Sequence, residues 1–151
     1  MHLFTVVELG IVVMFYKTLF SPEKNRGFYY GIILFFSLLC IVNAVFFQSI
    51  YTYNSYTKSI EAIICMLFAM KYFASIASGN NSSTKVLTSP DFYFNAAFFQ
   101  YFSGAFMLFV FSNFIITNLS KSDFLTIWMI HAVLVLLVYL LFSVAFLLCK
   151  K

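Results

Sequence analysis

Long apolar runs separated by short polar breaks dominate the chain. A helix that crosses a membrane needs about 20 mostly apolar residues, and the runs with that length predict helices over about 2–20, 28–51, 58–78, 92–119 and 124–149. The period-two alternation that indicates strands is not visible. The pattern therefore predicts an all-α protein, an integral membrane bundle of five transmembrane helices that form a single domain over residues 1–151.

The breaks between the runs carry the residues that end helices. SPEKNRG (21–27) contains proline, glycine and charges, TYNSYT (52–57) is polar and aromatic, and SGNNSSTKVLTSPD (78–91) contains glycine, asparagine and proline. SKSD (120–123) is short, and Ser122 or Asp123 suits the cap of the last helix. Loops this short predict that sequential helices are antiparallel neighbours.

Composition excludes an ordinary soluble domain. The chain is 63% hydrophobic and 9% charged, with a mean hydropathy of +0.96, whereas a soluble domain is about 25% charged. A net charge of +4 would suggest nucleic acid as the partner of a soluble protein. Here the cations lie mostly at segment ends, so we expect the lipid bilayer as the partner, and no nucleic acid.

The basic residues also predict an orientation. Seven fall on one side of the predicted spans: Lys17, Lys24, Arg26, Lys71, Lys85, Lys150 and Lys151. Only Lys58 and Lys121 fall on the other side. The positive-inside rule then places the N-terminus outside and the C-terminus in the cytoplasm, as in a multi-pass protein of the bacterial inner membrane.

Polar residues gather in the outer half of the predicted spans when depth is counted at about 1.5 Å per residue. The ligand-binding or proton-sensing candidates are Glu8, Asn43, Gln48, Glu61, Asn113 and His131. An ionisable group in a span is costly unless it faces protein or water. The hypothesis is an outward-facing polar pocket in which Glu8, Glu61 and His131 share one cavity.

Each ionisable candidate also has an ordinary interpretation. Glu61 can form an interfacial ion pair with Lys58, three residues earlier on the same helix. Glu8 can lie close enough to the interface to be hydrated, and His131 can be a hydrogen-bonded core histidine. In the helix over 92–119, polar and small residues fall on one half of the helix surface, which indicates contact with other helices. With the tryptophan of the last helix, the helix-packing candidates are Asn95, Gln100, Ser103, Gly104 and Trp128.

Motifs that carry chemistry are missing from the sequence. It has no GxSxG, HExxH, P-loop or dinucleotide fingerprint. Cys40, Cys65 and Cys149 are isolated in apolar runs, which favours packed thiols over metal ligands or disulfides. We therefore expect no enzyme, no catalytic residues, no metal and no cofactor.

SPDFYFNAAFFQYFSGAFMLFVFSN, followed by IWMIHAVLVLLVYLLFSVAF, resembles a family of small multi-pass inner-membrane proteins of Bacteroidota with no established activity. FFQSIYTYNSYTK (46–58) is similar too, and the resemblance covers roughly residues 45–146. The shared positions are Pro90, Phe92, Asn95, Tyr101, Phe102, Ser103, Gly104, Phe111, Ser112, Asn113, Trp128 and His131. Members are longer by about two N-terminal helices, so the resemblance implies a short or partial form. Members are often encoded near sensor histidine kinases, so the resemblance implies a signalling accessory.

The functional prediction is a non-enzymatic multi-pass membrane protein, a sensory or signalling accessory with a polar pocket in the outer half of the bilayer. One alternative is a structural or accessory subunit of a larger membrane complex. A second is a small transporter or proton-coupled carrier, against which the absence of an inverted repeat argues. The expected partner is another membrane protein or a second copy of the chain, as a homo-oligomer.

Overall fold

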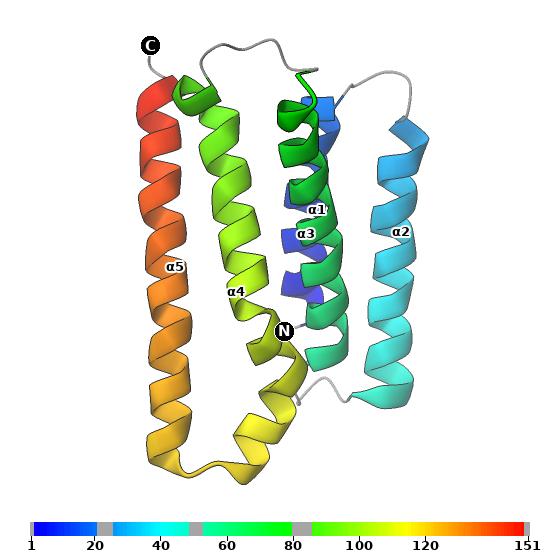
Figure 1. The fold of residues 1–151 in the computed structure, drawn as a ribbon. Coiled ribbons are helices and arrows are strands. Elements are labelled where there is room, and N and C mark those ends of the chain that lie inside the picture. The colour runs from blue at the N-terminus through cyan, green and yellow to red at the C-terminus, as the bar shows by residue number, and fades with distance from the viewer. Residues whose placement is uncertain (1, 21–25, 49–52, 80–85, 150–151) are drawn as a thin grey trace. The chain divides into compact units, whose positions relative to one another are not determined.

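The computed structural model describes residues 2–20, 26–48, 53–79 and 86–149, and over these ranges the secondary structure is helical. The long helices are α1 (His2–Phe20), α2 (Arg26–Val42), α3 (Ser55–Ala77), α4 (Pro90–Asn118) and α5 (Lys121–Cys149) (Figure 1). All five are long and apolar enough to cross a membrane. The predicted all-α class and the five long helices are thus confirmed for the described residues. Lys24, Lys85, Lys150 and Lys151, which entered the orientation argument, lie outside them.

The end of α2 differs from the single helix expected over 28–51. The α-helix stops at Val42, a π-helix η1 (Asn43–Phe47) follows, and Gln48 is extended. The wider turn is closed by a bond of 2.7 Å from the Gln48 amide to the Asn43 carbonyl. A π-helix inserts one extra residue per turn, and here it allows the Asn43 and Gln48 side chains to bond each other at 3.1 Å. Residues 49–51 lie outside the described ranges.

The residue that caps the start of α5 lies slightly earlier in the chain than predicted. Ser120, rather than Ser122 or Asp123, caps the helix. The Asp123 amide donates to Ser120 Oγ at 3.2 Å, and the Ser120 hydroxyl donates to Asp123 Oδ2 at 2.7 Å. The first bond is the N-cap bond of a capping box, the second joins the two side chains, and α5 begins three residues before the predicted start.

The chain divides into two compact units, to which α3 and α4 both contribute. Unit 1 is Met1–Glu61 with Phe109–Asn118, and unit 2 is Ala62–Leu108 with Leu119–Lys151. In unit 1, α1 packs against α2. The buried apolar residues of these two helices are Leu9, Val12, Val13, Tyr16, Tyr29, Phe36 and Cys40. Close to one end of unit 1, Lys17 Nζ on α1 donates to the Tyr30 hydroxyl on α2 at 2.8 Å.

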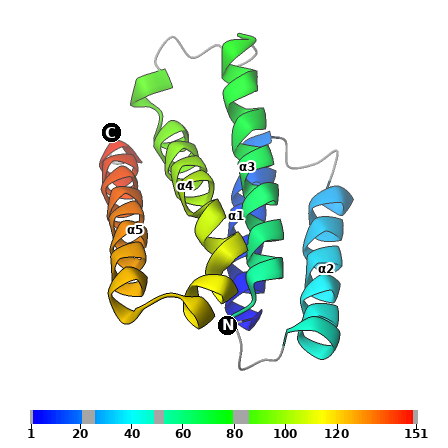
Figure 2. The ribbon, with the colours of Figure 1, turned by 60° about the horizontal axis from the view of Figure 1, so that its bottom comes forward.

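Aromatic rings join α4 and α5 in unit 2, where the two helices lie side by side (Figures 1 and 2). The ring of Phe94 on α4 lies 5.3 Å, centre to centre, from the rings of Phe142 and Phe146 on α5, and Phe98 lies 5.6 Å from Phe142. All three pairs meet edge to face, the arrangement that aromatic quadrupoles favour.

A buried amide and a close approach complete the α4 contacts in unit 2. Asn95 is fully buried and donates to the Ala69 carbonyl of α3 at 3.4 Å. A methyl group built on Gly104 would lie 2.9 Å from Leu134 Cδ2 of α5, too close for ordinary contact. Gly104 therefore sits where the Leu134 side chain needs room, which is the role that small residues have between membrane helices.

The outer surface of α5 is almost entirely apolar and exposed. Among its described residues only Ala145 is buried. Large exposed side chains such as Leu136, Leu140 and Phe146 run along it. A water-soluble protein rarely leaves such a surface uncovered, whereas lipid covers it without cost.

Replacing Gly104 with leucine is expected to overpack the contact with Leu134. We expect a loss of about 1–3 kcal/mol in the free energy of unfolding, measured by thermal unfolding in mild detergent. Gly31→Leu is the matched control, because a methyl group at Gly31 meets nothing within 4 Å. Adding Leu134→Ala to Gly104→Leu should restore part of the loss. Equal stability of Gly104→Leu and the original chain would contradict this account of the packing.

Candidate functional site

One lysine lies between two glutamates inside unit 1. Lys58 Nζ on α3 forms ion pairs with Glu8 of α1 and with Glu61, and its distance from Glu61 Oε2 is 2.9 Å. The Glu61 side chain is fully buried, whereas the side chains of Lys58 and Glu8 are 9% and 21% exposed. We call Glu8, Lys58 and Glu61 the charged cluster. It brings together two of the residues that the sequence singled out, on two different helices.

The surroundings of the charged cluster are largely apolar. The rings of Phe4 and Phe109 lie 5.2 and 5.8 Å from Lys58 Nζ, within the range of a cation–π contact. Although Glu61 is ion-paired, neither of its oxygens accepts a hydrogen bond of good geometry from the described residues. Most buried polar atoms in proteins do have such a partner, so Glu61 is the member of the cluster whose hydrogen-bonding capacity is least satisfied.

Tyr53, just before α3, lies near the charged cluster. Burial raises the pKa of its phenol, and the charges of Lys58, Glu61 and Glu8 also act on it. The phenol therefore stays neutral at physiological pH and adds no charge of its own.

Asn54 ties α1 to the first turn of α3. Its carbonyl accepts from the Lys58 amide at 3.1 Å, and its side-chain Nδ2 donates to Thr5 Oγ1 at 2.8 Å and to Thr57 Oγ1 at 3.1 Å. Asn54, Thr5 and Thr57 are almost completely buried. Asn54 Oδ1 is buried without a hydrogen-bond partner among the described residues, so this network has room for one more donor.

A second set of side chains links the end of α2, the start of α3 and the end of α4. Asn43 donates to Gln48 Oε1 at 3.1 Å, Gln48 donates to Ser55 Oγ at 2.8 Å, and Asn113 donates to Ser55 Oγ at 2.9 Å. We call Asn43, Gln48, Ser55 and Asn113 the polar chain. Three of its four members are sequence candidates, and the structure brings them into one line of hydrogen bonds around Ser55.

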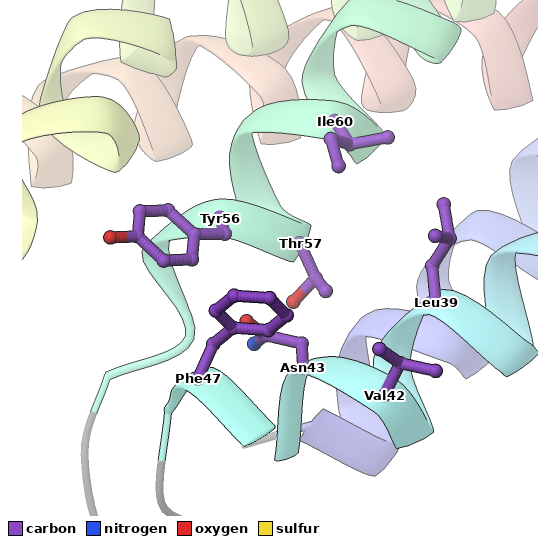
Figure 3. Close-up of a pocket in the computed structure, with 7 residues that line it drawn as sticks. All are labelled: Leu39, Val42, Asn43, Phe47, Tyr56, Thr57 and Ile60. Atoms are coloured by element: carbon purple, nitrogen blue, oxygen red, sulfur yellow. The ribbon is translucent and has the colours of Figure 1, made fainter. Parts of the chain in front are cut away.

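An apolar groove of about 390 Å³ lies next to the polar chain, between α2 with η1 and the start of α3. Its lining residues are Leu39, Val42, Asn43, Phe47, Tyr56, Thr57 and Ile60. Figure 3 shows these side chains around the groove, with Asn43 and Phe47 coming from η1 and Tyr56, Thr57 and Ile60 from the start of α3. Its volume falls within the range of small-molecule pockets, which are mostly apolar with a few polar groups.

His131 belongs to unit 2 and has partners there. Its Nε2 lies 3.3 Å from the Tyr101 hydroxyl of α4, and its ring meets the Trp128 ring edge to face at 5.1 Å. The structure thus gives Glu8 and Glu61 one environment and His131 another. A cavity shared by all three stays a prediction.

The remaining packing candidates of α4 differ in their surroundings. Gln100 Oε1 is buried without a hydrogen-bond partner among the described residues. Ser103 is exposed, and its hydroxyl donates to the Phe99 carbonyl of its own helix at 2.6 Å. The hydrogen bonds between described residues include none from the Gln100 amide or the Ser103 hydroxyl to a neighbouring helix, so the role of these two residues in packing stays a prediction.

Lys58, Asn54, Thr5 and Ser55 were not among the sequence candidates. Asn54, Lys58 and Glu61 are spaced i, i+4 and i+7, which places them on one face of a helix, and that spacing was a usable signal. Thr5 and Ser55 gave none, because hydroxyl residues in apolar helices commonly bond their own backbone. Their role depends on which helices meet.

The chemistry available at the charged cluster is the binding of positive charge. Two carboxylates face one ammonium group, and the two oxygens of the buried Glu61 carboxylate accept no hydrogen bond of good geometry from the described residues. Groups of three or more histidine, cysteine, aspartate or glutamate residues that could hold a metal ion are not found in the part of the chain that the structure describes.

Lys58→Met should leave the buried Glu61 and the partly buried Glu8 without their counter-charge. Removing one partner of a buried ion pair costs about 3–5 kcal/mol of unfolding free energy, which thermal unfolding in mild detergent would measure. Lys121→Met, at the exposed start of α5, is the control and should change little. Replacing Glu8, Lys58 and Glu61 together by methionine should recover most of the stability. Unchanged stability of Lys58→Met would show that the cluster does not depend on this lysine.

Comparisons of the chain with protein-family models, with curated proteins and with solved structures find no match. The resemblance to the Bacteroidota family therefore stays a prediction. Function has to be inferred from the charged cluster, the polar chain and the apolar groove, all of which lie in unit 1.

Proposed function

We propose that the chain is a multi-pass integral membrane protein of the bacterial inner membrane, with its N-terminus outside and its C-terminus in the cytoplasm. Five helices of sufficient length and apolarity support insertion, and the exposed apolar surface of α5 suits lipid. The uneven distribution of lysine and arginine supports the orientation. In this orientation the polar chain and the charged cluster lie in the outer half of the membrane.

Within the membrane, we propose that the protein is a non-enzymatic sensory or signalling accessory whose ligand site is the apolar groove. The observation that carries the proposal is that Asn43 and Thr57 belong both to the groove lining and to the hydrogen-bond networks that join the helices of unit 1. The other lining residues are aliphatic or aromatic, with the Tyr56 hydroxyl as their one polar group, and none of the seven is charged. The groove therefore suits a small, mostly apolar molecule with an uncharged hydrogen-bonding end.

A ligand bound in this groove would act directly on hydrogen bonds that connect the helices of unit 1. Its polar end would compete for the Asn43 amide, which bonds Gln48, or for the Thr57 hydroxyl, which bonds Asn54. Gln48 in turn bonds Ser55, to which Asn113 of α4 donates. A ligand that prefers one arrangement of these bonds shifts the population toward it, and the output passes to a partner through helix contacts.

A second candidate function is a structural or accessory subunit of a larger membrane complex. The observation that favours it is the surface of α5, along which only one described residue is buried. A helix of a partner, or of a second copy of the chain, would cover that surface as well as lipid does. This function needs no ligand in the groove, so the groove experiment below separates the two candidates.

The orientation predicts where single cysteines react. In a chain with Cys40, Cys65 and Cys149 replaced by alanine, Ser120→Cys should react with a membrane-impermeant maleimide in intact spheroplasts. Ser78→Cys should react only after the membrane is permeabilised. Both serines are exposed, so accessibility within the protein does not separate them. Equal labelling of the two positions would overturn the orientation, and the reverse pattern would invert it.

Filling the groove should remove its ligand. Leu39→Trp places a large ring into the groove, whereas Leu38→Trp, one residue earlier, places the same ring on an exposed surface outside the lining. After purification in mild detergent, mass spectrometry of extracted small molecules should find a compound with the original chain and with Leu38→Trp. We expect it to be reduced at least tenfold with Leu39→Trp. If partner proteins co-purify equally with all three and no compound is found, the subunit role is favoured over the sensory one.

A further inference from the structure

We propose that the charged cluster is a proton-binding site in which Glu61 carries the exchangeable proton. The inference rests on the geometry of unit 1 and does not depend on a ligand in the groove. It assigns a second chemical input to the protein, the proton, at a site that is separate from the residues lining the groove.

The first step is a charge count. Glu8 and Glu61 bring two negative charges when ionised, and Lys58 brings one positive charge. The other titratable groups that act on the cluster from the elements around it are Tyr53, before α3, and Cys40, on α2. A neutral phenol and a buried thiol add no positive charge. The fully ionised cluster therefore holds one uncompensated negative charge in apolar surroundings, which protein interiors avoid by taking up a proton.

The second step decides which carboxylate takes the proton. Glu8 accepts a hydrogen bond from Lys58, and its side chain is 21% exposed. Glu61 is fully buried; its Oε2 lies 2.9 Å from Lys58 Nζ, but neither of its oxygens accepts a hydrogen bond of good geometry from the described residues. Ionised carboxylates need donors more than neutral acids do. Lys58 and Glu8 thus form the charged pair, and Glu61 is the neutral acid.

The third step excludes a small metal ion as the occupant. A sodium or calcium ion needs several oxygen ligands that converge at one point. Glu8 Oε2 and Glu61 Oε2 both lie against Lys58 Nζ, which takes the place of a cation between them. In unit 1 the other buried oxygen without a hydrogen-bond partner among the described residues is Asn54 Oδ1, and Asn54 precedes Glu61 by seven residues, about 10 Å along a helix. These oxygens do not converge, whereas a proton needs only one of them.

Loss of the proton from Glu61 would change how the two carboxylates share the Lys58 ammonium group. When the Glu61 carboxyl ionises, its O–H bond breaks, the electron pair stays on the carboxylate, and the proton passes to water on the partly exposed side of Glu8. Two carboxylates then compete for Lys58. Since Lys58 follows Asn54 by one turn, a movement of Lys58 acts on the bonds from Asn54 to Thr5 and Thr57. The proton thereby influences the contact between α1 and α3.

Infrared difference spectroscopy of the chain in lipid vesicles, titrated with alkali, tests the proposal. The original chain should lose the carbonyl stretch of one protonated carboxylic acid as pH rises. Glu61→Gln should lack this band at every pH, and Asp123→Asn, which removes an exposed acid on α5, should retain it. A band that persists in Glu61→Gln but is absent in Glu8→Gln would overturn the assignment to Glu61. Absence of the band in the original chain would overturn the proton site itself.

Stability measured against pH gives a second readout that does not depend on spectroscopy. If the folded chain holds one more proton than the unfolded chain, its stability falls as pH rises. The unfolding temperature of the original chain should therefore fall between neutral and alkaline pH. That of Glu61→Gln, whose neutral amide mimics the protonated acid, should fall less over the same range. Parallel curves for the two proteins would contradict the proposal, and neither outcome bears on the groove ligand.

Discussion

The sharing of one buried ammonium group by two carboxylates is the constraint on which the rest of unit 1 depends. An ion in an apolar interior must be paired or neutralised, and Lys58 pairs with residues of two helices at once. This requirement holds α1 and α3 together, beside the bond from Asn54 to Thr5 that joins the same two helices. Packing between apolar helices in lipid has little hydrophobic driving force, so polar bonds of this kind specify which helices meet.

The architecture of the chain was readable from its sequence. Lengths of apolar runs predict the helices within a few residues, because spanning length and composition depend on the chain alone. The exceptions are local. Ser120 caps α5 through a partner three residues later, and the π turn after Val42 leaves no clear mark in a run of apolar residues.

The candidate site was predictable only in part. Glu8 and Glu61 stand out because carboxylates are rare in apolar helices, and the spacing of Lys58 and Asn54 adds to that signal. That Asn113 bonds Ser55, or that Thr5 bonds Asn54, depends on how distant segments meet in space. Local patterns carry no information of that kind. For His131 the structure gives the Tyr101 and Trp128 contacts, and a cavity shared with the two glutamates stays a prediction.

The π turn in η1 has a consequence for how the chain tolerates insertion and deletion. An extra residue in one turn advances every following side chain by about 100° around the helix axis. Here the shift falls between α2, whose exposed side chains are apolar, and Gln48, whose amide is buried, so the extra residue turns the end of the helix from an exposed face to a buried one. Loss of one residue from Asn43–Phe47 would leave length and hydropathy almost unchanged. It would nevertheless rotate the Gln48 side chain away from Ser55 and break the hydrogen bond between them, a change that composition does not reveal.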